Sequence, residues 1–297
     1  MKQMVNLHFL RERIPPPTSR NLWLWLAAAV ACQNLAVFHS SQSASVTVFA
    51  LLVWGGALIC IEDQLESLRP APSRLGQLAG GLLILFIIFR TSRILQWDGL
   101  LFLLAPASAI GLGLLCDKPR NLLRFKESFL CLLLIPGFAL IMRLIPEAPL
   151  SIATALISGL WLNIIGIDAS VESRKVMLQA GGVEVLGPCN GVDMMAQILC
   201  ISIIFLLAFP IKSLKSRSLL LLSAPIIGLI SNTLRIALLA FFSGNGNGKG
   251  TPLFTFFHDD AGSLIFSGIA VFVFGSLYMN LLERELPPMG SYGKGDS

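Results

Sequence analysis

The stretch LGQLAGGLLILFIIFR, at residues 75–90, contains no acidic residue and carries a single charge, at its last position. A run of this length and polarity approaches the ~20 residues that a helix needs to cross a bilayer. Similar runs recur along the whole chain, in which 55% of the 297 residues are hydrophobic and only 13% are charged. Soluble domains carry about 25% charged residues. The sequence therefore predicts an all-α polytopic membrane protein.

Nine apolar runs are candidates for helices, and the basic segments between them predict their placement. The runs are 21–38, 46–61, 75–90, 94–116, 127–145, 149–167, 190–210, 218–242 and 261–282. Basic residues of short loops collect on the cytoplasmic side, which assigns the N-terminal tail, 118–126 and 212–217 to that side. Three runs lie between the last two of these segments, so one of the three is expected not to cross.

The run at 149–167 is the best candidate for a helix that does not cross. It follows Pro146, includes Pro149, and carries polar residues at Ser151, Thr154, Ser158 and Asn163. We expect an interfacial or re-entrant helix there, on the outer surface. The result is eight crossings with both termini cytoplasmic. The expected division is a tail at 1–20, a single transmembrane domain at 21–286 and a tail at 287–297.

The connections between the expected crossings are simple. Residues 168–188 and 243–260 become outer loops, and Val176–Leu186 alternates loosely enough for a short extended stretch. The tract GNGNGKG at 244–250 is typical of a flexible loop. The first run continues past Cys32, which favours an uncleaved first helix over a secretion signal.

Composition excludes several functional classes. The net charge of +5 does not indicate nucleic-acid binding, because the basic residues lie in short loops between apolar runs. The six cysteines form no CxxC pair and no Cys/His spacing of a metal site. We therefore expect no metal, no cofactor and no disulfide framework.

Three polar clusters interrupt the last three crossings. They are GPCNG at 187–191, NTLR at 232–235 and HDDAG at 258–262. The expected topology places all three at one depth near the outer surface, although none of them was used to derive that topology.

Cys189 is the candidate nucleophile of the first cluster. A thiolate is favoured near a helix N-terminus, and Pro188 before it suits the start of a helix. The alternative is an interfacial cysteine packed as a small hydrophobic residue. Asp193, one turn deeper on about the same face, needs a partner, and Arg235 is the expected one unless Asp193 is partly exposed.

Arg235 lies ~25 Å along its crossing, in the outer leaflet. An arginine at that depth costs a few kcal/mol unless it is paired or faces a polar cavity, and the alternative is that it snorkels to the interface. Asn232, one turn earlier, is expected to share its face.

His258 is the favoured imidazole of the three in the chain. His8 lies in the cytoplasmic tail and is excluded, whereas His39, at the outer end of the first crossing, is the alternative candidate for the catalytic imidazole. His258 is preferred because Asp259 and Asp260 adjoin it; these acids orient the imidazole or cap the following helix, and capping is favoured. The alternative is a merely solvated interfacial histidine.

Together these residues predict acyl-transfer chemistry by a thiol. Cys189 would attack a peptide carbonyl and His258 would carry the proton as base and then acid. Arg235 would stabilise the oxyanion. The expected supporting residues are Asn190, Gly191, Asp193, Asn232, Asp259 and Gly262.

At these residues the chain resembles the exosortase/archaeosortase family. That family carries a Cys-x-Gly, an Asn-x-x-Arg and a His-x-x-x-Gly cluster on its last three membrane helices, and the chain has CNG at 189–191, NTLR at 232–235 and HDDAG at 258–262. The stretch TALISGLWLNIIGI at 154–167 is also similar. The resemblance covers about 149–282, the expected catalytic part. Asn190 stands where many members have Ser, which is similar to the cyanobacterial branch.

The resemblance implies a cysteine peptidase and transpeptidase in the bacterial cytoplasmic (inner) membrane. It would cleave, at the outer face, the C-terminal sorting tail of secreted proteins: a Pro-Glu-Pro-like (PEP-CTERM) motif, a membrane helix and a basic end. Partners would be these secreted proteins and membrane lipids; no feature of the sequence indicates the oligomeric state. Two other functions stay open, a transporter and a non-catalytic scaffold for envelope polysaccharide export. The lack of an inverted repeat disfavours the transporter.

Overall fold

The structure is a computed structural model that describes residues 19–41, 44–62, 70–92, 99–179, 181–243 and 251–285. The tail predicted at 287–297, the glycine-rich loop at 244–250 and all but the last two residues of the tail at 1–20 lie outside these ranges.

Every apolar run of the sequence is a helix in the described residues. The helices are α2 (Ser19–Ser41), α3 (Ala44–Ile59), α5 (Arg74–Ser92), α6 (Leu104–Cys116), α7 (Lys126–Leu144), α8 (Glu147–Ile164), α9 (Val192–Ala208), α10 (Leu214–Phe242) and α12 (Asp260–Glu283). Seven spans are long and apolar enough to cross a membrane, and α3 and α9 are apolar but shorter, with 16 and 17 residues. The protein is thus an all-α multi-pass membrane protein, as predicted.

The described residues also contain four short helices. They are η1 (Gly99–Leu103), η2 (Pro119–Phe125), η3 (Gly187–Cys189) and α11 (Pro252–His258). The first two extend the spans that contain α6 and α7, whereas η3 and α11 lie beside the starts of α9 and α12.

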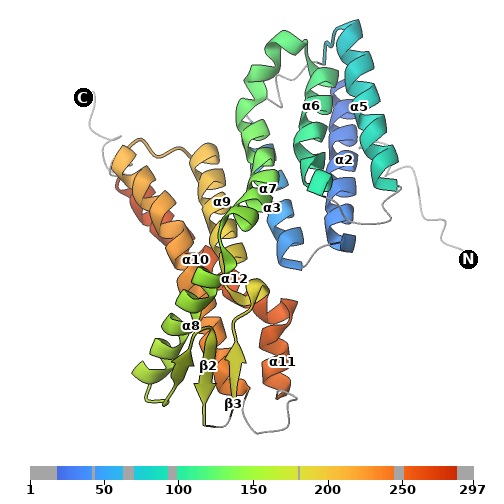
Figure 1. Cartoon of the computed structure of the whole chain (residues 1–297). Coiled ribbons are helices and arrows are strands. Elements are labelled where there is room, and N and C mark those ends of the chain that lie inside the picture. The colour runs from blue at the N-terminus through green and yellow to red at the C-terminus, as the bar shows by residue number, and fades with distance from the viewer. Residues whose placement is uncertain are drawn as a thin grey trace, which may run out of the picture.

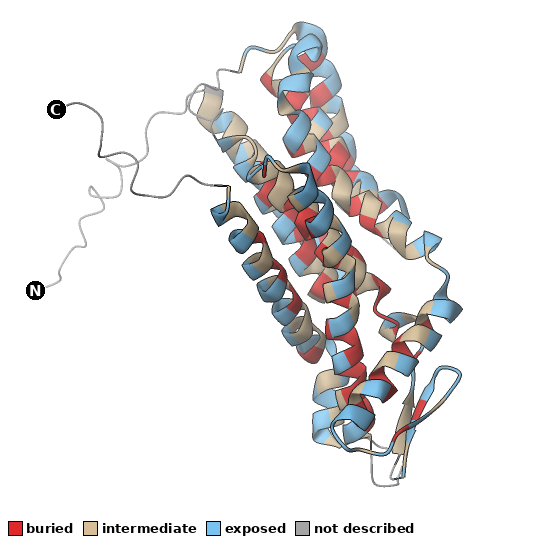
Figure 2. Cartoon of the chain, turned by 90° about the vertical axis from the view of Figure 1, so that its left-hand side faces the viewer, coloured by how far each residue is buried: buried red, intermediate tan, exposed pale blue. Residues whose placement is uncertain are grey.

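Large apolar side chains cover the outside of the bundle, as a lipid-facing surface requires. On α5, Leu78, Leu82 and Phe89 are each about three-fifths or more exposed, at 66%, 67% and 59%. The opposite face of α5 is buried at small residues, where a Cβ on Gly80 would lie only 2.8 Å from the carbonyl oxygen of Gly111. Figure 2 shows the same alternation of exposed and buried turns on the other helices. Small residues therefore bring helices close while leucines face outward.

The basic segments lie at one end of the bundle, the upper end in Figure 1. There η2 joins α6 to α7, and the short connection from α9 to α10 lies at the same end. The carboxylate of Glu285, just beyond α12, accepts backbone hydrogen bonds from Lys212 and Ser213, at 2.6 and 2.8 Å. The end of α12 is thus at the same end of the bundle as both basic segments, as the predicted topology requires.

Helix α8 continues from α7 toward the opposite end. It lies there with α11 and a small sheet, the lower end in Figure 1, and the chain returns through that sheet to η3 and α9. Its mean hydropathy of 1.2 is the lowest of the seven spans that could cross by length and composition. The expectation that α8 lies at a membrane surface stays a prediction.

The small sheet contains three antiparallel strands in the order β1 (Ser170–Glu172), β2 (Lys175–Leu178) and β3 (Gly181–Glu184). Ser173, with φ of 57°, forms the turn between β1 and β2. The single extended stretch expected at 176–186 was therefore too simple, because its residues form two strands and pair with a third.

Candidate functional site

Cys189 ends the 3-10 turn η3 and does not lie in the first turn of α9. Gly191 separates the two helices as the N-cap of α9, with φ of +89°. The side chain of Asn190 occupies the next position, and its Oδ1 accepts the backbone N–H of Val192 at 3.0 Å. Asn190 thus takes one of the free N–H groups at the α9 N-terminus that were expected to favour the Cys189 thiolate.

The Cys189 thiol is half-buried, and this environment decides its protonation. Burial raises the pKa of the Cys189 thiol above its usual value of 9.0, the nearby Arg235 guanidinium opposes this, and Asp193 adds to the rise. The resting thiol is therefore protonated at neutral pH. A base must remove its proton before it can act as a nucleophile.

Asn232 of α10 connects the second cluster to the first. Its side-chain Nδ2 donates to the backbone oxygen of Cys189 at 3.0 Å. A Cβ added to Gly191 would lie 2.6 Å from that same nitrogen. One turn earlier on α10, a Cβ at Gly228 would lie 2.8 Å from the Cα of Met195 on α9. These glycines let α10 approach the Cys189 turn closely.

Arg235 connects the second cluster to the third. Its guanidinium is buried, and it donates from Nε to the backbone oxygen of Phe257 at 3.1 Å and from Nη2 to that of His258 at 2.9 Å. Both carbonyls belong to the last turn of α11, so Arg235 holds the C-terminal end of that helix. Within the described residues, the Nη1 of Arg235 has no hydrogen-bond partner. The expected ion pair between Asp193 and Arg235 is also not formed there.

The His258 imidazole lies at the end of α11 on the outer side of this junction. Its side chain is 53% exposed, its ring stacks on Phe254 with centroids 5.5 Å apart, and its Nδ1 lies 3.9 Å from Asp259 Oδ1. No hydrogen bond joins it to the Cys189 thiol in the described part of the chain. Phe254, on which His258 stacks, nevertheless packs against the same apolar cluster as Cys189.

Gly262 and the two aspartates position α11 against α12. A Cβ at Gly262 would lie 2.4 Å from the Cα of Phe257, so only glycine allows the two helices to meet there. Asp259 is the N-cap residue of α12 but makes no side-chain capping bond. The Oδ2 of Asp260 accepts instead the backbone N–H of Ala44, the first residue of α3, at 3.3 Å. The expectation that these acids cap their own helix was therefore wrong, because they face other groups.

Helix α8 contributes side chains to this site that were not predicted from the sequence. Thr154 Oγ1 donates to the backbone oxygen of Asn190 at 2.7 Å, and Ser158 Oγ donates to that of Thr233 at 2.9 Å. The indole of Trp161 donates to Thr233 Oγ1 at 3.2 Å. The spacing 154, 158, 161 is one face of a helix, so the sequence contains the signal, although neither the resemblance at 154–167 nor the polarity of the run indicates these particular bonds.

His39, the rival imidazole, is exposed near the end of α2, and among the residues described it forms no hydrogen bond or ion pair with the three clusters. The described part of the chain contains no group of three or more His, Cys, Asp or Glu side chains that could bind a metal ion.

Comparison with known proteins adds the family. No curated protein and no solved structure matches the chain. The family model described as transmembrane exosortase matches residues 38–275, which is well over half of the chain and includes Cys189, Arg235 and His258. Because the match covers both the apolar bundle and all three polar clusters, this chain belongs to the transmembrane exosortase family.

Proposed function

We propose that this protein is a membrane-embedded cysteine peptidase and transpeptidase that removes the C-terminal sorting tail of secreted proteins. The observation that carries the proposal is the pair of connections on α10, where Asn232 holds the backbone of Cys189 and Arg235 holds the backbone of His258. One helix thereby joins the segments that carry the thiol, the guanidinium and the imidazole.

The chemistry follows from the roles of these groups. The Cys189 sulfur attacks the scissile carbonyl carbon while its proton moves to the His258 imidazole. The carbon–nitrogen bond then breaks, and the leaving amine takes that proton, which leaves a thioester on Cys189. Water or an acceptor amine attacks the thioester, its proton passes through His258, and the thiol is restored. No metal or cofactor is needed for this balance.

Arg235 fits the oxyanion of both tetrahedral intermediates. Two of its nitrogens are held by the α11 carbonyls, which fixes the plane of the guanidinium, and its Nη1 is left for another acceptor. A fixed cationic donor in a buried site stabilises developing negative charge strongly, because nothing has to reorganise during the reaction.

The protonated resting thiol also fits this scheme. A neutral thiol that is not hydrogen-bonded to the imidazole needs substrate to complete the proton path. In the resting folded protein we expect the Cys189 sulfur within about 4–5 Å of a His258 ring nitrogen, because catalytic hydrogen bonds in resting enzymes are often long. Substrate binding would exclude water from the His258 ring and bring the ring closer to the sulfur.

The substrate would be a secreted protein that ends in a Pro-Glu-Pro-like motif, a membrane helix and basic residues. The positive-inside rule, applied to the basic segments of the chain, supports a site at the extracytoplasmic face of the cytoplasmic membrane. A substrate whose basic end stays inside presents its motif at that face.

A processing assay tests the proposal. The protein is co-expressed with a secreted reporter that carries such a tail, and the reporter's size is followed on a gel. Cys189→Ala should abolish processing at unchanged protein abundance, and Cys189→Ser should leave at most a trace. The matched control is Cys32→Ala, at an exposed cysteine of α2, which should process normally. Normal processing by Cys189→Ala would replace the enzyme with the scaffold or transporter function.

A further inference from the structure

A large apolar cavity lies in the N-terminal half of the bundle, away from the Cys189 site. Its volume is about 760 Å³, and its walls come from α2, α3, α6 and the η2–α7 segment. On α2 it extends from Trp23 to Leu35, a rise of ~18 Å along the helix axis. The size is within the ~300–1,000 Å³ of ordinary ligand sites, but the shape is elongated along the bundle.

The lining is almost entirely hydrocarbon. Leu24, Leu51, Leu58 and Leu132 face it, and small residues such as Ala28 and Gly55 widen it. Gly55 has no atom within 4 Å of where a Cβ would be, so the cavity is open at that point. Such a cavity favours a flexible apolar chain, because each buried methylene adds ~0.8 kcal/mol of binding.

One end of the cavity meets positive charge. Lys126 is part of the lining, and it begins α7 directly after η2. The segment Asp117–Glu127 carries four basic and two acidic residues, a net charge of 4 − 2 = +2.

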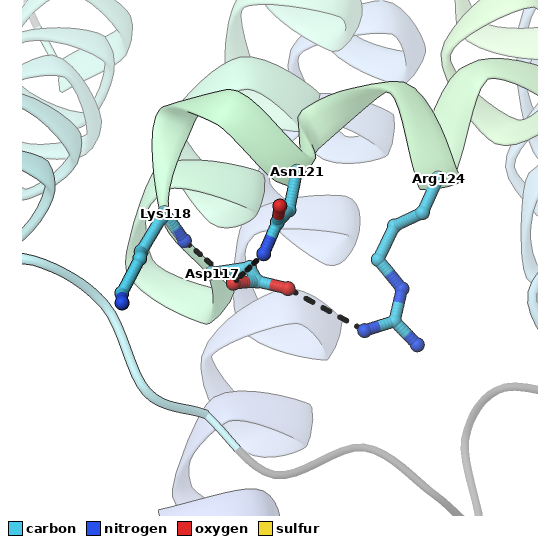
Figure 3. Close-up of polar contacts among 4 residues, drawn as sticks. All are labelled: Asp117, Lys118, Asn121 and Arg124. Carbon is cyan, nitrogen blue, oxygen red and sulfur yellow. Dashed lines mark hydrogen bonds and ion pairs between the residues drawn. The ribbon is translucent and has the colours of Figure 1, made fainter.

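Asp117, one of the two acids, is already partnered, as Figure 3 shows. It accepts hydrogen bonds from the Lys118 backbone at 2.7 Å and from Asn121 Nδ2 at 2.9 Å, and it pairs with Arg124 at 3.4 Å. Slight burial would raise the pKa of Asp117, but these bonds hold it below its usual range. This acid is thus engaged within its own turn, while Lys118, Arg120 and Lys126 are exposed.

We propose that this cavity binds an anionic phospholipid of the leaflet beside the basic segments. The acyl chains lie between α2 and α3, and the phosphate meets Lys126 and the exposed basic residues of η2. Basic pockets between membrane helices at the cytoplasmic side are suited to anionic headgroups.

The sorting tail of a substrate does not fit the same place. A membrane helix needs ~20 residues and ~30 Å of space, which exceeds the cavity, and its basic end would meet like charge at the mouth. The lipid inference is independent of the proposed enzyme function.

The test uses the full chain purified in mild detergent and offered equal amounts of phosphatidylglycerol and phosphatidylcholine. Native mass spectrometry counts the lipids retained. The wild type should retain phosphatidylglycerol preferentially, and Lys126→Gln should reduce that preference about fivefold, the value of one basic residue near an anionic headgroup.

Two filling variants separate the cavity from the outer surface. Gly55→Leu should lose the retained lipid, whereas Gly81→Leu on α5, where a Cβ also meets nothing within 4 Å, should keep it. If Gly55→Leu fails to fold, Ala28→Leu fills the same cavity from α2. Equal retention of both lipids, or retention unaffected by the filling variants, would overturn the inference.

Discussion

At the scale of single residues, Cys189 is a thiol whose reactivity depends on two opposing neighbours. Burial and Asp193 keep it protonated, and Arg235 acts the other way. Its reactivity therefore reports the electrostatics of the site directly.

The first prediction concerns the pH dependence of Cys189 alkylation. Because the pKa of the thiol is raised above 9.0, the thiolate fraction is small at neutral pH, and the alkylation rate should still be rising at pH 9. Arg235→Gln removes the charge that lowers the pKa, so its rate should be lower at every pH in this range. The measurement is iodoacetamide labelling of Cys189 followed by mass spectrometry, with the Cys189→Ala variant as the blank. A rate that reaches its plateau below pH 8 would mean a resting thiolate.

The second prediction separates the two tasks of Arg235. The three N–H donors of lysine radiate from one nitrogen, so lysine cannot reproduce the planar, spread donors by which Arg235 bonds both α11 carbonyls and offers Nη1 elsewhere. Arg235→Lys should cost about 1–3 kcal/mol of stability from an unpaired buried carbonyl. It should also lower processing by ~10²–10³-fold, as expected for a lost oxyanion donor. Unfolding midpoints and single-turnover rates measure the two effects; a loss of stability with normal processing would make Arg235 a purely structural residue.

The third prediction compares the two histidines. His258→Ala should abolish processing, because the His258 ring stacks on Phe254, which packs in the same apolar cluster as Cys189. His39→Ala should be nearly silent, because His39 forms no hydrogen bond or ion pair with the three clusters in the described part of the chain. Both variants are made in the same reporter strain. Equal loss in the two would remove the assignment of His258 as the base.

At the scale of elements, the glycines fix how closely helices approach. Gly191 and Gly262 each lie where a Cβ would meet a neighbouring element at under 3 Å, at Asn232 and at Phe257 respectively. At Gly191 the positive φ adds backbone strain to the clash.

The fourth prediction tests this at Gly262, whose φ is ordinary. Gly262→Ala should push α11 away from α12, displace His258 and reduce processing several-fold. The matched control is Gly268→Ala on the same helix, where a Cβ meets nothing within 4 Å. The reporter assay and a thermal unfolding scan measure both variants; identical behaviour would show that the α11–α12 contact does not set the site.

Apolar length predicted the helices well, because a bilayer crossing requires a long run whatever its neighbours are. Every predicted run is a helix within a few residues, including α10, predicted at 218–242 and found at Leu214–Phe242. The 3-10 turn before α9 and the three-stranded sheet were not predicted, because they depend on a positive φ and on pairing between short segments.

The structure brings together the segments that carry the predicted clusters, but the connections between them were not predicted. The spacing of the clusters indicated Cys189, Arg235 and His258, and the structure brings their segments together. The pairing of Asp193 with Arg235 was the natural expectation for two charges in a membrane, yet the arginine bonds backbone carbonyls of α11. Such a choice depends on a helix end that only the folded chain supplies.

At the scale of the whole molecule, the direction of α8 decides the sidedness of everything after it. We predict that reporter fusions at Gly166 and at Lys212 lie on opposite sides of the membrane, the first outside and the second inside. The control is a fusion at Asn121 in η2, expected inside. A fusion at Gly166 that reports the cytoplasm would mean that α8 crosses, and the Cys189 site would then face the other way.

Helix α10 has 29 residues and is therefore ~44 Å long, whereas the hydrocarbon layer is ~30 Å thick. The helix must tilt or protrude at one end, and the end with Asn232 and Arg235 packs on α8 and the small sheet. In the proposed reaction this packing would hold the site at a fixed height in the membrane. A substrate anchored by its own membrane helix would carry its scissile bond at a fixed height as well. Enzyme and substrate would then meet by diffusion in two dimensions, so encounter would depend on their density in the membrane rather than on their concentration in solution.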